Sequence, residues 1–133
     1  MYQYNYSKDF INLHVFEFKD KVQKNEFERF KEDFDKLLTL NSEFYAVFNL
    51  LDIKDFDIKF FYKKMDYIYS NKEVVKKLLQ ASSIVIKNSY GNLIKLGLKI
   101  KKPLSPNLVC DNMGLGVQFL IDDYQKNNDL KVN

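Results

Sequence analysis

The sequence predicts an α/β protein with a mixed, mostly parallel sheet of about five strands, an N-terminal hairpin and helices packed on the sheet. Phe44–Leu51 is an apolar run of strand length, interrupted only by Asn49, as expected for an interior strand that helices cover. After that run, short apolar segments alternate with helical periodicities, which indicates parallel strands joined by helices. Two strand patterns separated by a turn open the chain and predict one antiparallel pair.

The first half of the chain contains the predicted hairpin, one helix and most of the aromatic rings. Tyr2, Tyr4 and Tyr6 alternate along a first strand, and the denser apolar run Phe10–Phe18 predicts a more buried second strand. Asn25 can cap a helix. The apolar stripe of this helix has spacings of 3, 4 and 3 residues and consists of Phe27, Phe30, Phe34 and Leu37. Because 18 of the 21 Phe and Tyr residues lie within the first 69 positions, we expect an aromatic core there.

Two helices and a strand are predicted to follow the central run. Asp57 can cap a helix that ends at Ser70 and Asn71, and Lys72–Gln80 predicts a short second helix. The apolar face of the first of these helices consists of Ile58, Phe61, Met65 and Ile68. Ser83–Lys87 is rich in β-branched residues and predicts the next strand.

The last two predicted helices lie on either side of a short strand. A helix capped by Asn88 or Ser89 should run to about Lys101. We expect its inner residues to be Leu93, Leu96 or Gly97, and Ile100. Leu108–Cys110 predicts the last strand, and a final helix follows. The residues that share the inner face of that final helix are Met113, Val117, Leu120 and Tyr124.

Length and composition indicate a single domain. We expect this domain over residues 1–126, because 133 residues can bury a core, and a polar, frayed tail over residues 127–133. The chain starts without the pattern of a signal peptide, and no apolar run approaches the roughly 18 residues that span a bilayer. With Cys110 as its single cysteine, the chain cannot form an internal disulfide. We therefore expect an intracellular, cytoplasmic protein, and the abundance of Lys, Asn and Ile over Arg indicates an AT-rich genome.

Two segments resemble a known family. In Asn49–Asp57 (NLLDIKDFD) a strand ends, an aspartate follows it, and an acidic turn precedes a helix. Ile84–Asn112 has the strand, helix and strand that follow in the family, with Lys102 and Pro103 closing the helix. In this element order the chain resembles a STAS-like domain, from the sulfate-transporter and anti-sigma-factor-antagonist family, and the related CRAL-TRIO core. The resemblance covers most of the chain and implies a fold used for protein contacts.

The chain departs from both families where their activities reside. Regulatory STAS members carry a phosphorylatable serine just after the aspartate at the start of this helix, whereas Ile58 and Lys59 follow Asp57 here. The resemblance therefore implies a domain without the phosphorylation switch. CRAL-TRIO lipid carriers are longer and have a lid and a pocket, for which 133 residues leave little room.

Neither His14 nor Cys110 has the partners that a catalytic site needs. His14 lies in a predicted strand and is the only histidine, so we interpret it as structural or surface-exposed. Cys110 precedes a helix start that could lower the pKa of its thiol, but the apolar strand around it favours a small buried side chain. The sequence therefore predicts no catalytic residue and no cofactor.

Acidic residues gather after the central strand, at the edge of the sheet where open α/β proteins bind ligands. Asp52, Asp55 and Asp57 could hold Mg²⁺, which would make the protein a metal-dependent enzyme. Ser89 opens a helix after the next strand, where backbone amides could bind an anion. Solvated aspartates that cap a helix explain the first group equally well, and a plain helix start explains Ser89.

The positive charges are concentrated in one part of the chain. Val74–Cys110 contains seven lysines and no acidic residue, so the rest of the chain carries −4 within a total of +3. These lysines are Lys76, Lys77, Lys87, Lys95, Lys99, Lys101 and Lys102. Such a face suits the acidic surface of another protein, nonspecific nucleic acid or an anionic membrane surface, and a solvated face without a partner has the same pattern.

We expect a non-enzymatic module that binds another protein through this lysine-rich face, as a regulatory or assembly subunit. Nucleic-acid readers rely on arginine and exposed rings, and this segment has no arginine and only Tyr90. The alternatives are nonspecific nucleic-acid binding, a lipid-binding CRAL-TRIO-like protein, and a metal-dependent enzyme that uses the aspartate loop.

Overall fold

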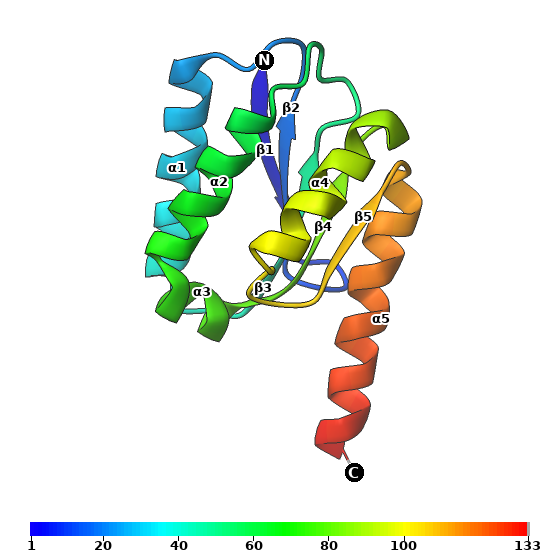
Figure 1. Ribbon diagram of the computed structural model, residues 1–133. Helices are drawn as coiled ribbons and strands as arrows, with labels where there is room; N and C mark the ends of the chain where they lie inside the picture. Colours follow the sequence, from blue (N-terminus) through cyan, green and yellow to red (C-terminus); the bar gives the residue numbers. More distant parts are fainter. Residues whose placement is uncertain (133) are drawn as a thin grey trace.

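The computed structural model describes residues 1–132, and the order of its strands and helices is the one that the sequence predicts (Figure 1). The elements are β1 (Tyr2–Ser7), β2 (Leu13–Phe18), α1 (Lys24–Thr39), β3 (Phe44–Asn49), α2 (Ile58–Ser70), α3 (Lys72–Leu78), β4 (Leu79–Val85), α4 (Asn88–Ile100), β5 (Asn107–Cys110) and α5 (Met113–Val132).

The strands form one sheet in the order β1-β2-β3-β4-β5. β1 and β2 are antiparallel, with Tyr4 opposite Phe16. The pairs β2–β3, β3–β4 and β4–β5 are parallel. The predicted class, a mixed and mostly parallel sheet of five strands with an N-terminal hairpin, is therefore confirmed.

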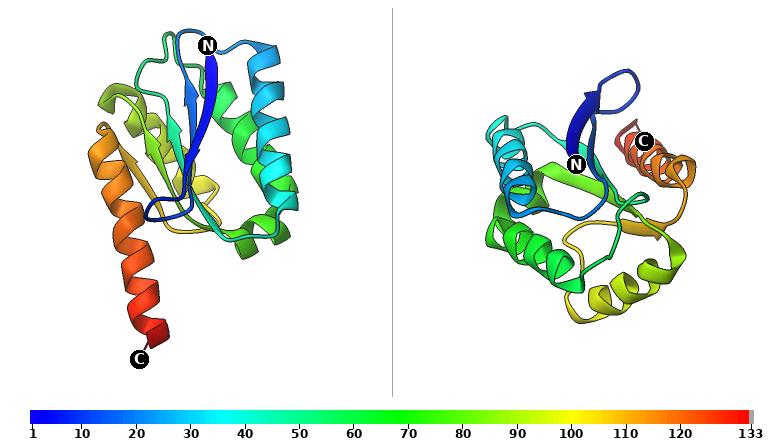
Figure 2. Two further views of the ribbon diagram at one scale, coloured as in Figure 1. Left: turned by 180° about the vertical axis from the view of Figure 1, so that it is seen from behind. Right: turned by 90° about the horizontal axis from the view of Figure 1, so that it is seen from above.

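The helices form two unequal layers on the sheet. Parallel crossovers are almost always right-handed, so crossovers that advance in one direction along a sheet place their helices on the same face. The apolar residues of α1, α2, α3 and α4 accordingly share one core cluster, whereas Leu120 of α5 belongs to a second cluster. Figure 2 shows α1, α2 and α4 on one side of the sheet and α5 on the other.

Strand β3 lies at the centre of the sheet and is covered on both faces. Its alternate residues enter the two core clusters: Phe44, Ala46 and Phe48 enter the first, and Tyr45 and Val47 the second. The prediction that Phe44–Leu51 contains an interior strand is confirmed, although the strand ends at Asn49. The Asn49 side chain accepts a hydrogen bond from the Leu51 amide at 3.2 Å, which turns the chain out of the sheet.

The face of the sheet under α1 and α2 is packed with aromatic rings, as the composition predicts. Phe30 of α1 lies 5.3–6.1 Å, between ring centroids, from Phe16, Phe18 and Phe48 of the sheet and Tyr67 of α2. All four pairs are edge-to-face, the geometry that ring quadrupoles favour. This cluster ties α1 and α2 to the sheet.

The largest differences from the predicted strand boundaries are the starts of β2 and β4. β2 begins at Leu13 instead of Phe10, because the apolar run includes a loop whose Phe10 ring is exposed and packs edge-to-face against Tyr124 of α5. β4 begins at Leu79 instead of Ser83, since its first residues already pair with the start of β3, and α3 is correspondingly shorter.

Helix ends also differ from the prediction. The Glu26 carboxylate accepts a hydrogen bond from the Gln23 amide at 2.8 Å, so α1 is capped at Gln23 rather than Asn25. Helix α5 continues to Val132, so residues 127–132 extend a helix beyond the proposed domain end at 126. Whether this polar end frays in solution stays a prediction, and residue 133 lies outside the described residues.

Helix α4 turns a different face to the sheet from the one that the sequence predicts. Its buried residues are Gly91, Ile94 and Gly97. Among the predicted inner residues, Gly97, the alternative to Leu96, is buried, whereas Leu93, Leu96 and Ile100 are exposed. Both sets have helical spacing, so periodicity alone cannot choose between them. Close packing against α2 decides which face of α4 is buried. A Cβ at Gly97 would lie 3.0 Å from the Phe61 ring, so α4 can approach α2 this closely only through its glycine face.

His14 of β2 is buried and satisfied by hydrogen bonds. The Asn12 amide nitrogen donates to the Glu43 carbonyl, so the Asn12 oxygen faces the histidine and accepts from its Nε2–H at 3.0 Å. The Tyr4 hydroxyl then donates to Nδ1 at 2.6 Å. Burial, with a smaller contribution from the Lys8 charge, lowers the pKa of His14 to about 4. The ring is therefore neutral at pH 7.

We expect His14 to make the fold sensitive to acid. The unfolded chain binds a proton at this ring near pH 6.5 and the folded chain only near pH 4, so stability is lost as pH falls between these values. From pH 7 to pH 5 the loss from this ring is about 2 kcal/mol. In His14→Gln, which cannot titrate, urea unfolding at the two pH values should show a drop smaller by that amount. An unchanged drop would contradict the assignment.

Candidate functional site

The structure distributes the seven lysines of Val74–Cys110 over three places. Two lie in the last turn of α3, one lies just before α4, and four lie on α4 or directly after it; in that order they are Lys76, Lys77, Lys87, Lys95, Lys99, Lys101 and Lys102. All are exposed except Lys101. The Lys101 ammonium lies 2.6 Å from the Asp66 carboxylate and 4.7 Å from the centre of the Tyr69 ring, so its charge already has a partner.

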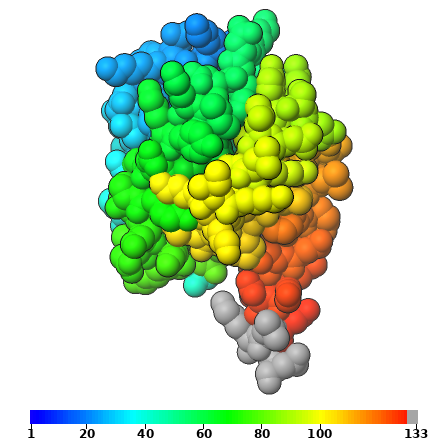
Figure 3. All heavy atoms as spheres, viewed as in Figure 1, coloured from blue at the N-terminus to red at the C-terminus, as the bar shows by residue number. Residues whose placement is uncertain are grey.

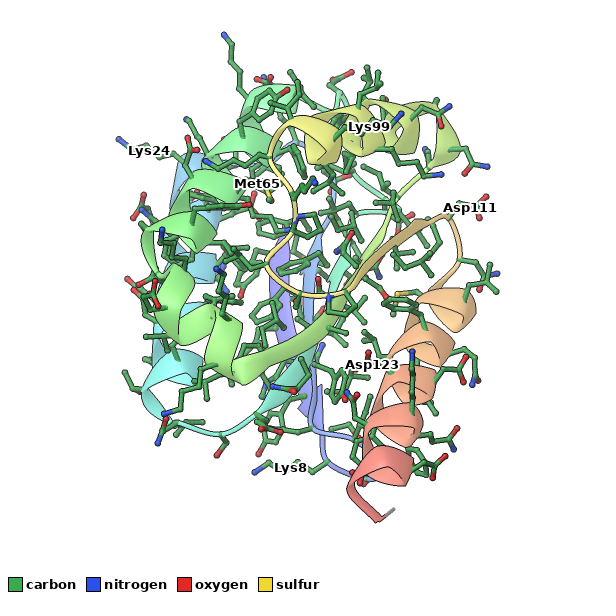
Figure 4. The ribbon with its side chains drawn as sticks, turned by 60° about the horizontal axis from the view of Figure 1, so that its bottom comes forward. Lys8, Lys24, Met65, Lys99, Asp111 and Asp123 are labelled. Atoms are coloured by element: carbon green, nitrogen blue, oxygen red, sulfur yellow. The ribbon has the colours of Figure 1, made fainter. Side chains whose placement is uncertain are left out.

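The outer face of α4 combines lysines with apolar side chains. Leu93, Leu96 and Ile100 are 49%, 57% and 84% exposed, and they form a stripe with spacings of 3 and 4 residues. Lys95 and Lys99 lie beside this stripe and are the only charged residues of the helix. We call these five residues the α4 surface. Figure 3 shows α4, in lime to yellow, across the front of the molecule, and Lys99 is labelled on it in Figure 4.

The α4 surface is unusual because its helix is apolar on two sides. A surface helix normally keeps one apolar stripe for the core and polar residues for the solvent. Fully burying a Leu or Ile side chain is favourable by about 1.5–3 kcal/mol, so a partner that covers this row of three exposed side chains is stabilised in its bound position. Tyr62 of α2, itself 41% exposed, adds to this side of the molecule, since its ring approaches Gly97. Contiguous apolar patches of this kind mark interaction sites.

The predicted aspartate loop connects β3 to α2. Asp52, Asp55 and Asp57 are all exposed. The Asp57 carboxylate accepts a hydrogen bond from the Lys59 amide at 2.9 Å and so caps α2, as predicted. Across residues 1–132, no group of three or more His, Cys, Asp or Glu side chains is placed to hold a metal ion. The described geometry therefore adds nothing to the metal hypothesis.

Ser89 lies exposed in the first turn of α4, and neither it nor Asn88 is the cap residue that the sequence predicts. The N-cap position is Lys87, whose side chain makes no capping hydrogen bond. The prediction fails because the Asn88 side chain is used elsewhere, donating to the Asp111 carboxylate at 3.0 Å. The rings of Phe56 and Tyr90, 5.3 Å apart, join the aspartate loop to this helix start.

A groove between α1 and α2 is the first of two features that the sequence analysis missed. Its volume is about 750 Å³, and Phe27, Phe60 and Tyr67 form part of its apolar floor. Its charged lining consists of six lysines and four acidic residues, namely Lys21, Lys24, Lys31, Lys54, Lys59, Lys63, Glu28, Asp55, Asp57 and Asp66. We call this feature the α1–α2 groove. It joins segments far apart in the sequence, so no local pattern could have revealed it.

The second missed feature is a buried lysine on the inner face of α2. Lys64 is 3% exposed, and its ammonium nitrogen lies 3.3 Å from the centre of the Phe48 ring. Burial lowers the pKa of Lys64 to about 7. The sequence did contain a signal, because Lys64 has helical spacings of 3 and 4 from the inward residues Phe61 and Ile68.

Lys64 lines a crevice of about 30 Å³ between α2, β4 and the segment that follows α4. Among the residues that line this crevice, Lys64 alone is ionisable. The other polar residues are Ser82, Ser105 and Asn107. The Asn107 amide nitrogen donates to the Ser82 hydroxyl at 2.9 Å, while its oxygen is buried with no hydrogen-bond partner. Figure 4 shows Met65, the neighbour of Lys64, facing the segment after α4. We call this feature the Lys64 crevice.

Cys110 lies at the end of β5 and is half-buried. Its sulfur is 3.4 Å from the Asn112 carbonyl oxygen and close to Gly116 of α5, where the Ser83 hydroxyl donates to the Gly116 carbonyl at 2.8 Å. These contacts belong to the packing of α5 on the sheet. In the described part of the chain, no helix is both long and apolar enough to cross a membrane.

The sheet order, the opening hairpin and the layer of helices define a STAS-like α/β fold. The chain is similar to the crystal structure of an uncharacterized protein of the DUF3478 family, with a SpoIIAA-like fold, from Shewanella loihica PV-4. The TM-score is 0.66 at 9% identity, over 90% of this chain and 92% of that one, so the likeness concerns the fold alone. No model of a protein family matches the sequence, and no curated protein matches it.

We expect Lys64→Met to stabilise the protein. The unfolded chain protonates this amine below pH 10.5 and the folded chain only below about pH 7, so the lysine opposes folding increasingly as pH falls between these values. At pH 7 the variant should gain about 4 kcal/mol in urea unfolding, and about 2 kcal/mol less at pH 9. The exposed neighbour Lys63→Met serves as the control and should change stability little at either pH.

Proposed function

We propose that this protein is a non-enzymatic, STAS-like module that binds another protein through the α4 surface, as a regulatory or assembly subunit. The observation that supports this most is the exposed stripe of Leu93, Leu96 and Ile100 on a helix whose only charges are lysines. Of the seven lysines, the proposal therefore gives Lys95 and Lys99 the central role.

The chemistry of the surface selects the partner. An apolar row at spacings of 3 and 4 residues suits an amphipathic helix laid against it. The flanking lysines would pair with aspartate and glutamate residues beside the apolar row of the partner helix. Lys87 and Lys102 extend the positive charge beyond both ends of α4. Charge complementarity of this kind contributes mainly to specificity and to the rate of association.

We further propose that phosphorylation at the start of α2 does not regulate this binding. Asp57 caps the helix, and the next two residues, Ile58 and Lys59, have no hydroxyl group that could accept a phosphate. The module would then bind its partner without the switch that regulatory STAS domains use.

The α1–α2 groove favours a second candidate function, binding of an amphipathic anion such as a lipid with an acidic headgroup. Its volume of about 750 Å³ lies within the range of small-molecule sites. Its apolar floor would contact a chain or ring, and its lysines an anionic group. Denaturing mass spectrometry of the protein purified from its natural source would detect such a ligand.

Leu96→Glu should strongly weaken the binding of the partner. It places a negative charge in the middle of the apolar stripe, and we expect binding at least about tenfold weaker. The wild-type protein and the variant are used as baits in native extract, with and without nuclease, and the retained proteins are identified by mass spectrometry. A supporting result is a protein with an acidic amphipathic segment that the variant loses and that nuclease does not release.

Leu115→Glu is the matched control for this experiment. Leu115 is 58% exposed on α5, in the other layer, so the same substitution should leave capture intact. Equal capture by all three baits would contradict the proposal. Loss of the signal with nuclease would favour nucleic acid instead, and binding to vesicles of anionic lipid would favour a membrane surface.

Reversing the charge of Lys95 and Lys99 should slow association with the captured partner. Exposed charges steer encounter, so we expect Lys95→Glu/Lys99→Glu to reduce the association rate about tenfold at low salt and to weaken its salt dependence. Surface plasmon resonance at two salt concentrations measures both effects. Lys36→Glu/Lys126→Glu makes the same change of charge on α1 and α5. A fall as large in this control would show that net charge, rather than the α4 surface, drives the encounter.

A further inference from the structure

The Lys64 crevice contains a buried lysine beside one buried polar atom that has no hydrogen-bond partner. Lys64 as a residue is 3% exposed, its nitrogen lies over the Phe48 ring, and no carboxylate is among the crevice residues. The Asn107 side-chain oxygen is buried in the same crevice and accepts no hydrogen bond. Buried polar groups are normally paired, and each unpaired one calls for an explanation. An acceptor without a partner and a buried lysine in the same small crevice indicate a site.

The surroundings of Lys64 are those of a nucleophilic amine. A lysine becomes a nucleophile when desolvation in an apolar pocket keeps it unprotonated at neutral pH. Most crevice residues are apolar, among them Met65, Ile68 and Leu104. The lowered pKa agrees with this environment: about half of the Lys64 side chains carry a free amine at pH 7, compared with roughly one in 2,500 for an ordinary lysine.

We propose that Lys64 is a reactive amine that captures small aldehydes as an imine inside this crevice. The amine nitrogen adds to the carbonyl carbon, and one of its protons moves to the carbonyl oxygen to give a carbinolamine. The nitrogen lone pair then forms the C=N bond as the hydroxyl group leaves with the second amine proton as water. The step needs no oxidant or reductant.

The polar residues of the crevice suit this chemistry. The Asn107 oxygen can accept a hydrogen bond from the carbinolamine hydroxyl, and the Ser82 hydroxyl can donate to the carbonyl oxygen. The Phe48 ring, already 3.3 Å from the nitrogen, stabilises a protonated imine through its π face.

The size of the crevice restricts the substrate to the smallest carbonyl compounds. A volume of about 30 Å³ corresponds to about two water molecules, so the crevice favours aldehydes of one or two carbons over aromatic aldehydes. The capture site faces the sheet and shares none of the residues of the α4 surface, so it is independent of the proposed protein-binding function.

Reductive trapping tests the proposal on the intact protein. The wild-type protein is incubated briefly at pH 7 with acetaldehyde and sodium cyanoborohydride, and N-ethyl groups are located by peptide mass spectrometry. We expect Lys64 to be labelled at least about tenfold faster than its exposed neighbour Lys63. Benzaldehyde should not label Lys64, and in Lys64→Met the fast label should disappear.

Unfolding provides the internal control, because in concentrated urea acetaldehyde should label Lys63 and Lys64 at equal rates. The proposal is overturned if the folded protein labels Lys64 no faster than Lys63. It is also overturned if benzaldehyde labels Lys64 as fast as acetaldehyde does, since the crevice would then not select its substrate. Partner capture by the wild-type and Lys64→Met proteins should be equal, which separates this result from the test of the α4 surface.

Discussion

The order of the strands, together with the right-handed crossover, decides on which face of the sheet α1, α2, α3 and α4 lie. Each parallel strand is added on the same side of the previous one, so α1, α2, α3 and α4 must share one face. Only α5, which follows the last strand, is free to reach the other face, where it packs over β4 and β5 and touches β3. The opposite face of β1 accordingly carries Gln3 and Asn5, polar residues that remain in water.

Four helices share one face of the sheet, and this crowding accounts for the aromatic packing there and for the position of α4. The aromatic residues of α1 and α2 fill the space above the first three strands, and among the helices and strands the last crossover helix packs mainly against α2 and β5. Gly97 lets α4 approach α2, because a glycine leaves room for the facing Phe61 ring. A helix at the margin of a layer has one side to bury, yet α4 carries a second apolar stripe. Within residues 1–132, no other part of the protein covers that stripe.

The sequence predicts those features of the fold that depend on neighbouring residues along the chain. The unbroken apolar run of β3 and the ring stripe of α1 each had one compatible interpretation, so the class of fold, the order of its elements and the interior strand were predictable. The orientation of α4 was not predictable, because Gly91 and Leu93 begin two stripes that both have helical spacing, and the choice depends on a tertiary contact at Gly97. The α1–α2 groove and the Lys64 crevice likewise arise where distant segments meet. Lys64 alone was visible in the helical spacing of α2.

The cost of Lys64 shows how the parts of the fold depend on one another. A buried amine whose pKa is lowered to about 7 opposes folding by about 4 kcal/mol at pH 7, a large fraction of the roughly 5–15 kcal/mol that stabilises a typical domain. The edge-to-face rings around Phe30 pack on the same face of the sheet and must offset that cost. The segment after α4 lines the crevice through Leu104, while Lys101, at the end of α4, pairs with Asp66. A partner seated on the α4 surface would therefore lie beside the segment that borders the Lys64 crevice.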